Sequence, residues 1–330
     1  MNLRQNRAPD PARATVIAHR GASYLAPEST AIAYRIARDL GADFLEADLQ
    51  RTADGEIIIH HDEDLLRTTN VASVYPERSR SRPSAFTLED LCHPRLETGA
   101  WFNAAYPARA SATFVGQKIL TLAGLADIAR EGPRLPGLYL ELKVPGIEEA
   151  VVAALQRLGL VEPDGTPRHR LFVQCFREES LETLRRIAPA LPRVLLTDGR
   201  AQEGRREKLG IEQILAVADR VEAAAVAPLA SLLLPSVNRA ALKERPASGG
   251  GTLLMHPWAV NNPLLMRLLI YLGADGLHTD RAEVHLLLQG SIRRADVRRV
   301  LDEAGVERQK PTLPSRLAGI GDWFRALTSA

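Results

Sequence analysis

Eight short apolar runs recur along the 330-residue chain, and stretches with helical periodicity lie between most of them. The runs cover residues 15–19, 44–49, 138–143, 171–176, 193–198, 223–228, 253–258 and 275–280. Strands that alternate with helices indicate βαβ units and a parallel sheet. Eight such units favour an α/β fold of the (β/α)8 TIM type over an open dinucleotide-binding sheet, and no GxGxxG follows the first run.

A ninth run, residues 56–62, cannot be a further parallel strand. Only residues 50–55 separate it from the second barrel strand, which is too few for a parallel crossover, and Asp54-Gly55 is a strong hairpin signal. We expect the run to return antiparallel to the second strand, with the pairing centred between Asp54 and Gly55. That register places His61 opposite Asp48.

The remaining sequence predicts one domain, residues 1–330, with two additions to the barrel. A large insertion of approximately residues 63–136 follows the second barrel strand and contains a capped helix start at 87–90 and a helix near 121–131. We expect it on the active-site face, where the loops that follow strands carry function. Approximately residues 291–330 form a C-terminal helical tail that can dock on the barrel, pair with another subunit or touch a membrane surface.

Bulk composition selects no macromolecular partner. The net charge is +2, and only 5% of residues are aromatic, which gives no support to nucleic-acid binding. Cys92 and Cys175 indicate no disulfide framework. The sequence shows no signal peptide and no apolar run long enough to span a membrane. We expect a cytoplasmic protein that acts on a small molecule; an exported form from which a leader was removed stays open.

Charged side chains occur in apolar strands, where an unpaired buried charge is costly. His19 and Arg20 stand at the end of the first run, Glu46 and Asp48 lie in the second, and Glu141 and Lys143 lie in the third. Residues two apart point to the same side of a strand. At the C-terminal ends of neighbouring barrel strands these side chains are expected to converge on one pocket.

Three crowded carboxylates repel one another unless a cation or a shared proton relieves the repulsion. Glu46, Asp48 and Glu141 offer only oxygen, which suits Mg²⁺ or Ca²⁺. Zinc normally recruits His or Cys, and the chain has no HxH or HExxH motif. The structural alternative is an ion network with Arg20 and Lys143.

Two histidines stand beside these carboxylates, and histidine is the residue type whose charge changes near neutral pH, as proton transfer requires. His19 and His61 are therefore candidate acid and base, and Arg20 and Lys143 can neutralise a phosphoryl oxygen. His60 is expected, by alternation along the strand, to point away. One cation, two bases and two positive side chains fit displacement at phosphorus.

At several places the sequence resembles the glycerophosphodiester phosphodiesterase family. The stretches that carry the resemblance are AHRGASYLAPEST (18–30), FLEADLQRTADGEIIIHHDEDLLRTT (44–69), LELK (140–143), QCF (174–176), PWAVN (257–261) and GADGLHTDRAE (273–283). They occur in the family's order and cover most of the chain outside the insertion and the tail. The combination is highly specific.

The resemblance implies a metal-dependent enzyme that hydrolyses glycerophosphodiesters to glycerol 3-phosphate and an alcohol. It implies His19 and His61 as general acid and base, the three carboxylates as metal ligands, and Arg20 and Lys143 as phosphate-binding residues. Glu28 is implied to order the pocket, Trp258 to form an apolar wall and Asn261 to belong to the substrate site. Ala259, Cys175 and Ser29 depart from the family pattern.

Several alternatives stay open. A lysophospholipase D-like or phosphoinositide-type phosphodiesterase shares the barrel and the paired histidines. A metal-dependent amidohydrolase also uses a similar barrel, but the missing HxH pair opposes it. A non-catalytic barrel that binds metal or phosphate would require a broken catalytic set, and no member is missing. The sequence leaves open Mg²⁺ against Ca²⁺, the head group, and attack by water against attack by the neighbouring glycerol hydroxyl.

Overall fold

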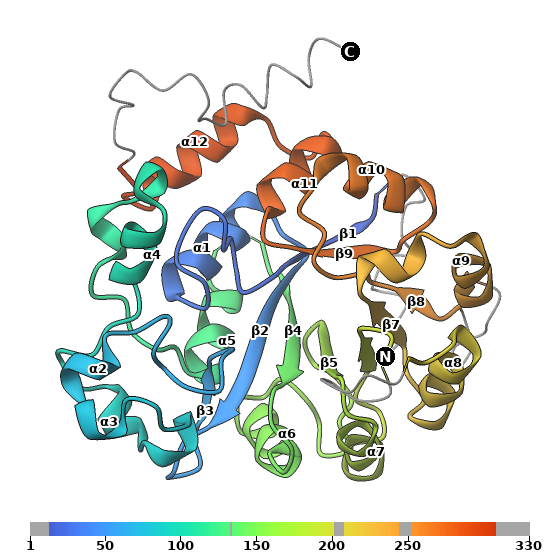
Figure 1. Ribbon diagram of the computed structural model, residues 1–330, viewed down its shortest axis with the longest axis horizontal. Helices are drawn as coiled ribbons and strands as arrows, with labels where there is room; N and C mark the ends of the chain where they lie inside the picture. The colour runs from blue at the N-terminus through green and yellow to red at the C-terminus, as the bar shows by residue number, and fades with distance from the viewer. Residues whose placement is uncertain (1–12, 133, 201–207, 244–251, 308–330) are drawn as a thin grey trace.

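A computed structural model describes residues 13–132, 134–200, 208–243 and 252–307. Eight parallel strands form a near-closed barrel in the order β8-β7-β6-β5-β4-β2-β1-β9 (Figure 1). They are β1 (Thr15–Ala18), β2 (Phe44–Arg51), β4 (Gly137–Leu142), β5 (Leu171–Cys175), β6 (Arg193–Thr197), β7 (Ala225–Pro228), β8 (Leu254–Met255) and β9 (Gly276–Thr279). Each lies within a predicted apolar run or beside it, so the predicted fold class is confirmed.

Backbone hydrogen bonds bridge the remaining gap between β8 and β9. The amide of Asp275 donates to Met255 at 2.9 Å, and the amide of His278 donates to Pro257 at 2.9 Å. β8 and β9 are therefore neighbours although they are not joined as a regular ladder, and the strand ends surround one common mouth.

Helices surround the barrel and connect its strands. They are α1 (Ala31–Leu40), α5 (Leu122–Arg130), α6 (Glu148–Arg157), α7 (Glu178–Ile187), α8 (Ile211–Arg220), α9 (Ser236–Lys243), α10 (Pro263–Tyr271), α11 (Ala282–Leu288) and α12 (Arg294–Glu303). Local signals set their ends: the Thr30 hydroxyl accepts from Ala33 at the start of α1, and Gly41, with φ of 98°, ends it. α5 packs against α1 and so belongs to the ring of helices (Figure 1).

Between β3 (Ile57–Ile59) and α5 the chain forms a compact insertion with short helices. These are α2 (Val71–Val74), α3 (Leu88–Leu91) and α4 (Ala100–Ala105), with 3₁₀ turns at Pro76–Arg78, Pro83–Ala85, Pro107–Arg109 and Ala112–Phe114. A separate small core supports it, built from Ile58, Leu65, Val71, Phe86, Leu91 and Leu96. The predicted capped start is present, since Thr87 and Asp90 form a reciprocal capping box.

The predicted hairpin exists, but its register differs by one residue from the prediction. β3 (Ile57–Ile59) pairs antiparallel with β2, and Leu49 faces Ile59. The His60 amide bonds to the Asp48 carbonyl, so the prediction that His61 lies opposite Asp48 is wrong. The turn has three residues, and its last, Gly55, has a φ of 93°. That loop shifts the pairing relative to a two-residue turn.

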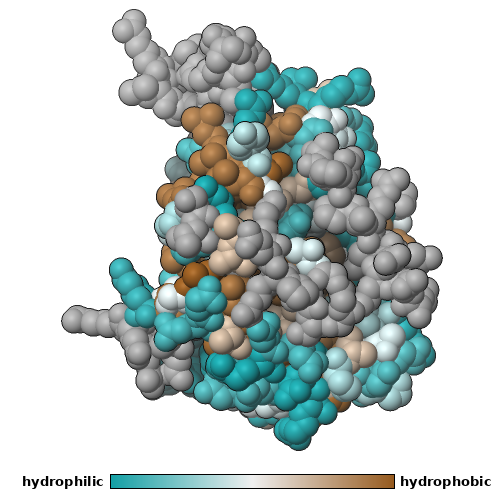
Figure 2. Space-filling model, turned by 90° about the vertical axis from the view of Figure 1, so that its right-hand side faces the viewer, coloured by the Kyte–Doolittle hydropathy of each residue, from teal (hydrophilic) through white to brown (hydrophobic). Residues whose placement is uncertain are grey.

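Among the described residues, α10 carries a stripe of exposed apolar side chains. Leu264, Leu268 and Tyr271 on α10 are 68%, 43% and 88% exposed. Figure 2 shows apolar surface on the side of the molecule that carries α8 to α10. None of the described helices combines the length and hydropathy that crossing a bilayer requires. The part of the predicted tail beyond residue 307 lies outside the described residues.

Candidate active site

The barrel interior is arranged in layers, with an aromatic floor beneath a polar layer. Phe44, Tyr139 and Phe172 pack together inside the barrel, with ring centroids 5.1–5.8 Å apart. Two residues further along the same strands stand Glu46, Glu141 and Gln174. Because alternate residues face the same side, the apolar layer supports the acidic layer from below.

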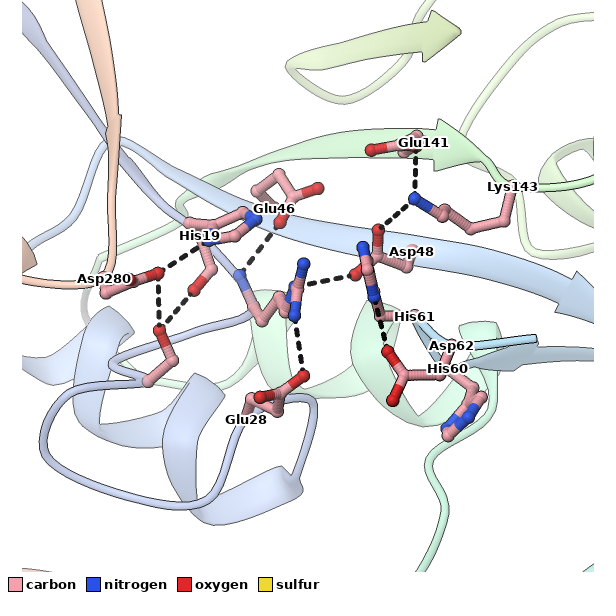
Figure 3. A network of polar contacts seen from close by, with 12 residues as sticks. His19, Glu28, Glu46, Asp48, His60, His61, Asp62, Glu141, Lys143 and Asp280 are labelled. Carbon is pink, nitrogen blue, oxygen red and sulfur yellow. Dashed lines mark hydrogen bonds and ion pairs between the residues drawn. The ribbon is translucent and has the colours of Figure 1, made fainter. Parts of the chain in front are cut away.

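Three carboxylates meet above this floor. Asp48 of β2 and Glu141 of β4 are paired positions on adjacent parallel strands. Together with Glu46 they place one oxygen each within 4.8 Å of one another, and all three residues are buried. The strand placement predicted from the sequence is thus what brings the three side chains together (Figure 3).

Two cations balance part of this negative charge. Nζ of Lys143 lies 2.8 Å from Glu141 and 3.7 Å from Asp48, and Nε of Arg20 lies 3.2 Å from Asp48. Neither carboxylate oxygen of Asp48 has a hydrogen-bond partner among the described residues, although both are buried. The Arg20 contact is therefore an ion pair without hydrogen-bond geometry.

The carboxylates respond to this crowding in opposite directions. Burial, together with the charge of Asp48, raises the pKa of Glu46 to about 8. Burial also raises the pKa of Asp48, but Arg20 and Lys143 outweigh it and hold that pKa at about 2. Asp48 therefore stays ionised while Glu46 resists ionisation. The site holds less positive charge than its carboxylates need to be ionised together.

A divalent cation fits this site. The donor set is entirely oxygen, as Mg²⁺ and Ca²⁺ prefer, and the two buried Asp48 oxygens lack hydrogen-bond donors in the described chain. The alternative, an ion network with Arg20 and Lys143 alone, leaves both Asp48 oxygens without a hydrogen-bond donor among the described residues. The cluster is thus able to hold one divalent metal.

His19 follows β1 and is held by a carboxylate from the neighbouring strand. Its Nδ1 lies 2.6 Å from Oδ1 of Asp280, which follows β9 (Figure 3). Burial and the charge of Arg20 lower the pKa of His19, but Glu46 and Asp280 raise it by more, so the pKa lies above its ordinary value. The Ser23 hydroxyl donates to the His19 carbonyl at 2.8 Å and fixes the loop.

His61 has a matching partner in its neighbour in sequence. Its Nδ1 lies 2.7 Å from Asp62, and Asp62 in turn accepts from Arg67 (Figure 3). Arg67 also donates to both oxygens of Glu28, at 2.7 and 2.8 Å. The chain leaves the strand after Ile59, and His61 then lies beside Asp48 in spite of the shifted register. His60 is buried and bonds to the Asp64 carbonyl, away from the cluster.

Arg20 links these parts through an unusual backbone conformation. Its φ of 56° lies in the left-handed region, which costs free energy for a residue with a side chain. In this conformation its amide donates to Glu46 at 2.9 Å while its guanidinium donates to Glu28 at 2.8 Å. One residue thus orients a carboxylate of the cluster and one from the loop before α1.

A cavity of about 170 Å³ opens beside His19. Its barrel side includes His19, Arg20 and Asp280, and its other side includes Trp101, Tyr106 and Arg109 from the insertion. The insertion therefore borders the mouth of the barrel next to the candidate histidine.

Asn261 and Trp258, the two substrate-site residues predicted near the end of the barrel sequence, lie in different surroundings. Asn261 uses both ends of its amide within the protein: it donates to Asp280 at 2.6 Å and accepts from the Thr279 hydroxyl at 3.1 Å and the Asp280 amide at 2.9 Å. Trp258 donates to the Thr197 carbonyl and stands edge-on to Phe176. It does not line the cavity beside His19.

Sequence reasoning missed several polar residues of the site. Asp280, Asp62, Arg67 and Gln174 all contact predicted site residues, and the Gln174 amide donates to Glu46 at 3.1 Å. A signal existed for Asp280, because a carboxylate directly after a barrel strand lies at the catalytic face. Asp62 follows His61 directly, whereas no sequence pattern pairs Arg67 with Glu28.

Comparisons with known proteins agree with this architecture. Residues 19–284 match the model of the glycerophosphoryl diester phosphodiesterase family. A glycerophosphodiester phosphodiesterase of Bacillus subtilis (strain 168) is 34% identical over 274 residues, which cover 82% of this chain and 84% of that protein.

Two solved structures share the fold. One is a glycerophosphodiester phosphodiesterase from Agrobacterium tumefaciens, with 22% identity, a TM-score of 0.61 and coverage of 83% of this chain and 99% of that chain. The other is an Oleispira antarctica phosphodiesterase in complex with its product sn-glycerol-3-phosphate, with 21% identity, a TM-score of 0.61 and coverage of 83% and 96%. The chain thus belongs to the glycerophosphoryl diester phosphodiesterase family and is a phosphodiesterase.

Proposed function

We propose that this enzyme hydrolyses glycerophosphodiesters to glycerol 3-phosphate and an alcohol, with one Mg²⁺ or Ca²⁺ held by Glu46, Asp48 and Glu141. One observation carries the proposal: three buried carboxylates, within 4.8 Å of one another, stand beside two histidines that are each bonded to an aspartate. The product bound in the Oleispira antarctica phosphodiesterase is glycerol 3-phosphate, which supports the choice of substrate.

Glu46, Asp48 and Glu141 would hold the cation, which would supply Lewis acidity toward a phosphoryl oxygen of the substrate. Arg20 and Lys143 add positive charge at the same place, since both lie against the carboxylates that hold the metal. Charge that develops on the phosphoryl oxygens in the transition state is then neutralised by groups already in position.

His19 and His61 carry out the two proton transfers of the reaction. In each ring Nδ1 is bonded to an aspartate, which leaves Nε2 to meet the substrate. One imidazole takes the proton from the attacking oxygen, and the other delivers a proton to the departing alkoxide. Asp280 and Asp62 are positioning residues, because they fix the orientation of each ring.

Three further residues complete the proposed site. Glu28 holds Arg20 and Arg67 together and so orders the phosphate-binding side. Asn261 acts as a positioning residue, because its amide is bonded to Asp280 and Thr279. Trp258, edge-on to Phe176, is proposed as the apolar wall for the glycerol arm of the substrate.

The test is hydrolysis of glycerophosphodiesters with several head groups, measured by release of glycerol 3-phosphate. Activity is expected to disappear in EDTA and to return on addition of Mg²⁺ or Ca²⁺. Parallel assays with lysophospholipids distinguish a lysophospholipase D-like enzyme. Turnover that is indifferent to chelation would contradict the metal site, and release of a different product would contradict the proposed reaction.

A further inference from the structure

The insertion contributes one side of the cavity next to His19, and that side is rich in arginine and aromatic side chains. Trp101 comes from α4, and Tyr106 and Arg109 follow it. Tyr24 completes this side from the loop after β1. Because the cavity also borders Asp280 and Arg20, whatever occupies it is adjacent to the site of bond cleavage.

The aromatic rings of this cavity already carry guanidinium groups. Arg109 lies 4.0 Å from the ring centre of Tyr24 and 4.1 Å from that of Tyr106, and Arg281 lies 4.0 Å from that of Tyr24. Arg67 lies 5.6 Å from the ring centre of Trp101. A quaternary ammonium group needs uncovered aromatic faces, and here each of the three rings already has a guanidinium of the protein against it.

The negative groups of the cavity are engaged elsewhere. Glu28 is bonded to Arg20 and Arg67, and Asp280 is bonded to His19 and Asn261. Glu283 is not among the residues that line the cavity, and it lies 3.5 Å from Arg281.

Arg109 differs from these neighbours in its partners. Its guanidinium donates to the Tyr24 carbonyl, and among the described residues no carboxylate lies within ion-pair distance of it. It is half-buried and held on two rings, so its position is fixed before any ligand binds. A planar guanidinium with remaining N–H donors is suited to a carboxylate or a phosphate.

We infer that Arg109 is a specificity-determining residue, which selects phosphodiesters whose head-group alcohol carries a negative charge. The inference rests on the proposed function and adds the substrate class. The two alcohol arms of the diester leave phosphorus in different directions. The arm with the charged head group occupies the insertion cavity, and the neutral glycerol arm lies toward Trp258 on the other side of the mouth.

Glycerophosphoserine and glycerophosphoethanolamine form a matched substrate pair, because they differ by one carboxylate. Wild-type enzyme should show a higher kcat/KM for the serine diester by about tenfold, the size of one charge-assisted hydrogen bond at a half-exposed site. Arg109→Gln and Arg109→Met should both lose this preference. The kcat/KM for the serine diester should fall, and the kcat/KM for the ethanolamine diester should change little. Arg95→Gln removes an exposed charge of the same insertion and should keep the preference.

A wild-type enzyme that cleaves both diesters equally well, or Arg109 variants that keep the wild-type ratio, would overturn the inference and leave the proposed function intact. Cleavage of neither diester would instead refute the proposed function. Binding of both diesters is then measured by calorimetry in EDTA, where turnover is not required. This measurement tests whether Arg109 binds the carboxylate of the serine diester. Weaker binding of the serine diester alone in the Arg109 variants supports the inference, and equal binding by wild type and variants overturns it.

Discussion

Nδ1 of His19 lies 2.6 Å from Oδ1 of Asp280, and this contact joins the ends of β1 and β9, the first and last strands of the barrel. His61 and Asp62 repeat the arrangement at 2.7 Å on the other side of the carboxylate cluster. Each ring is thereby held by a carboxylate at Nδ1, which leaves the two Nε2 atoms for the proton transfer that we propose.

His19→Ala and His61→Ala should each reduce kcat by roughly 10²–10⁴-fold, the range expected for loss of a general acid or base. The fold should persist, because both side chains are about one-third exposed, at 29% and 32%. Steady-state turnover of glycerophosphoethanolamine and the melting temperature check both parts. His60→Gln serves as the control, since His60 bonds to the Asp64 carbonyl and points away. Near-normal turnover in either alanine variant would remove that histidine from the mechanism.

Asp280→Asn should lower kcat by about 10–100-fold while KM changes less, because the residue orients His19 and does not touch the reacting atoms. Burial lowers the pKa of His19, and Asp280 and Glu46 raise it. Loss of the Asp280 charge should therefore move the His19 limb of the pH–rate profile to lower pH. Asp39→Asn, on the exposed end of α1, is the charge-matched control. An unshifted profile in Asp280→Asn would argue against the pairing.

His256 predicts an acid-sensitive fold. Burial lowers its pKa to about 4, and its ring bonds to the Tyr139 hydroxyl inside the barrel. Below the ordinary pKa of about 6.5 the unfolded chain gains a proton that the folded chain does not, so stability is lost as the pH falls toward 4. The loss from this residue is on the order of 3 kcal/mol over that window.

Urea unfolding of wild type and His256→Gln at several pH values checks this prediction. The free energy of unfolding of the variant should depend less steeply on pH between about 6.5 and 4. Part of the slope should remain, because burial also lowers the pKa values of His278 and His285. The same slope in both proteins would show that His256 does not titrate in this way.

Strand periodicity was enough to predict the barrel and the carboxylate cluster, because both depend on short-range patterns. Glu46, Asp48 and Glu141 stand at alternate positions of two apolar strands, and adjacent strands bring them together. The predicted hairpin register was wrong by one residue. Asp54-Gly55 indicated a two-residue turn, whereas the turn has three residues. Both candidate histidines nevertheless lie beside the cluster.

Contacts between distant segments could not be predicted in the same way. Asp280 lies 261 residues from His19, and Arg67 lies 39 from Glu28, so no local pattern relates the partners. The helix near 121–131 was assigned to the insertion, whereas in the structure it packs against α1 in the outer ring. Its sequence shows that it is a helix but does not show which surface it covers.

Titration of Mg²⁺ and Ca²⁺ into the wild-type enzyme and into Asp48→Asn, followed by calorimetry, tests the metal site most directly. Asp48 has two buried oxygens without hydrogen-bond partners in the described chain, so it is the ligand whose loss should matter most. We predict one cation per wild-type chain, and binding at least about tenfold weaker in Asp48→Asn. Absence of binding in the wild type, or the same affinity and stoichiometry in both proteins, would contradict the proposal that these carboxylates hold a cation.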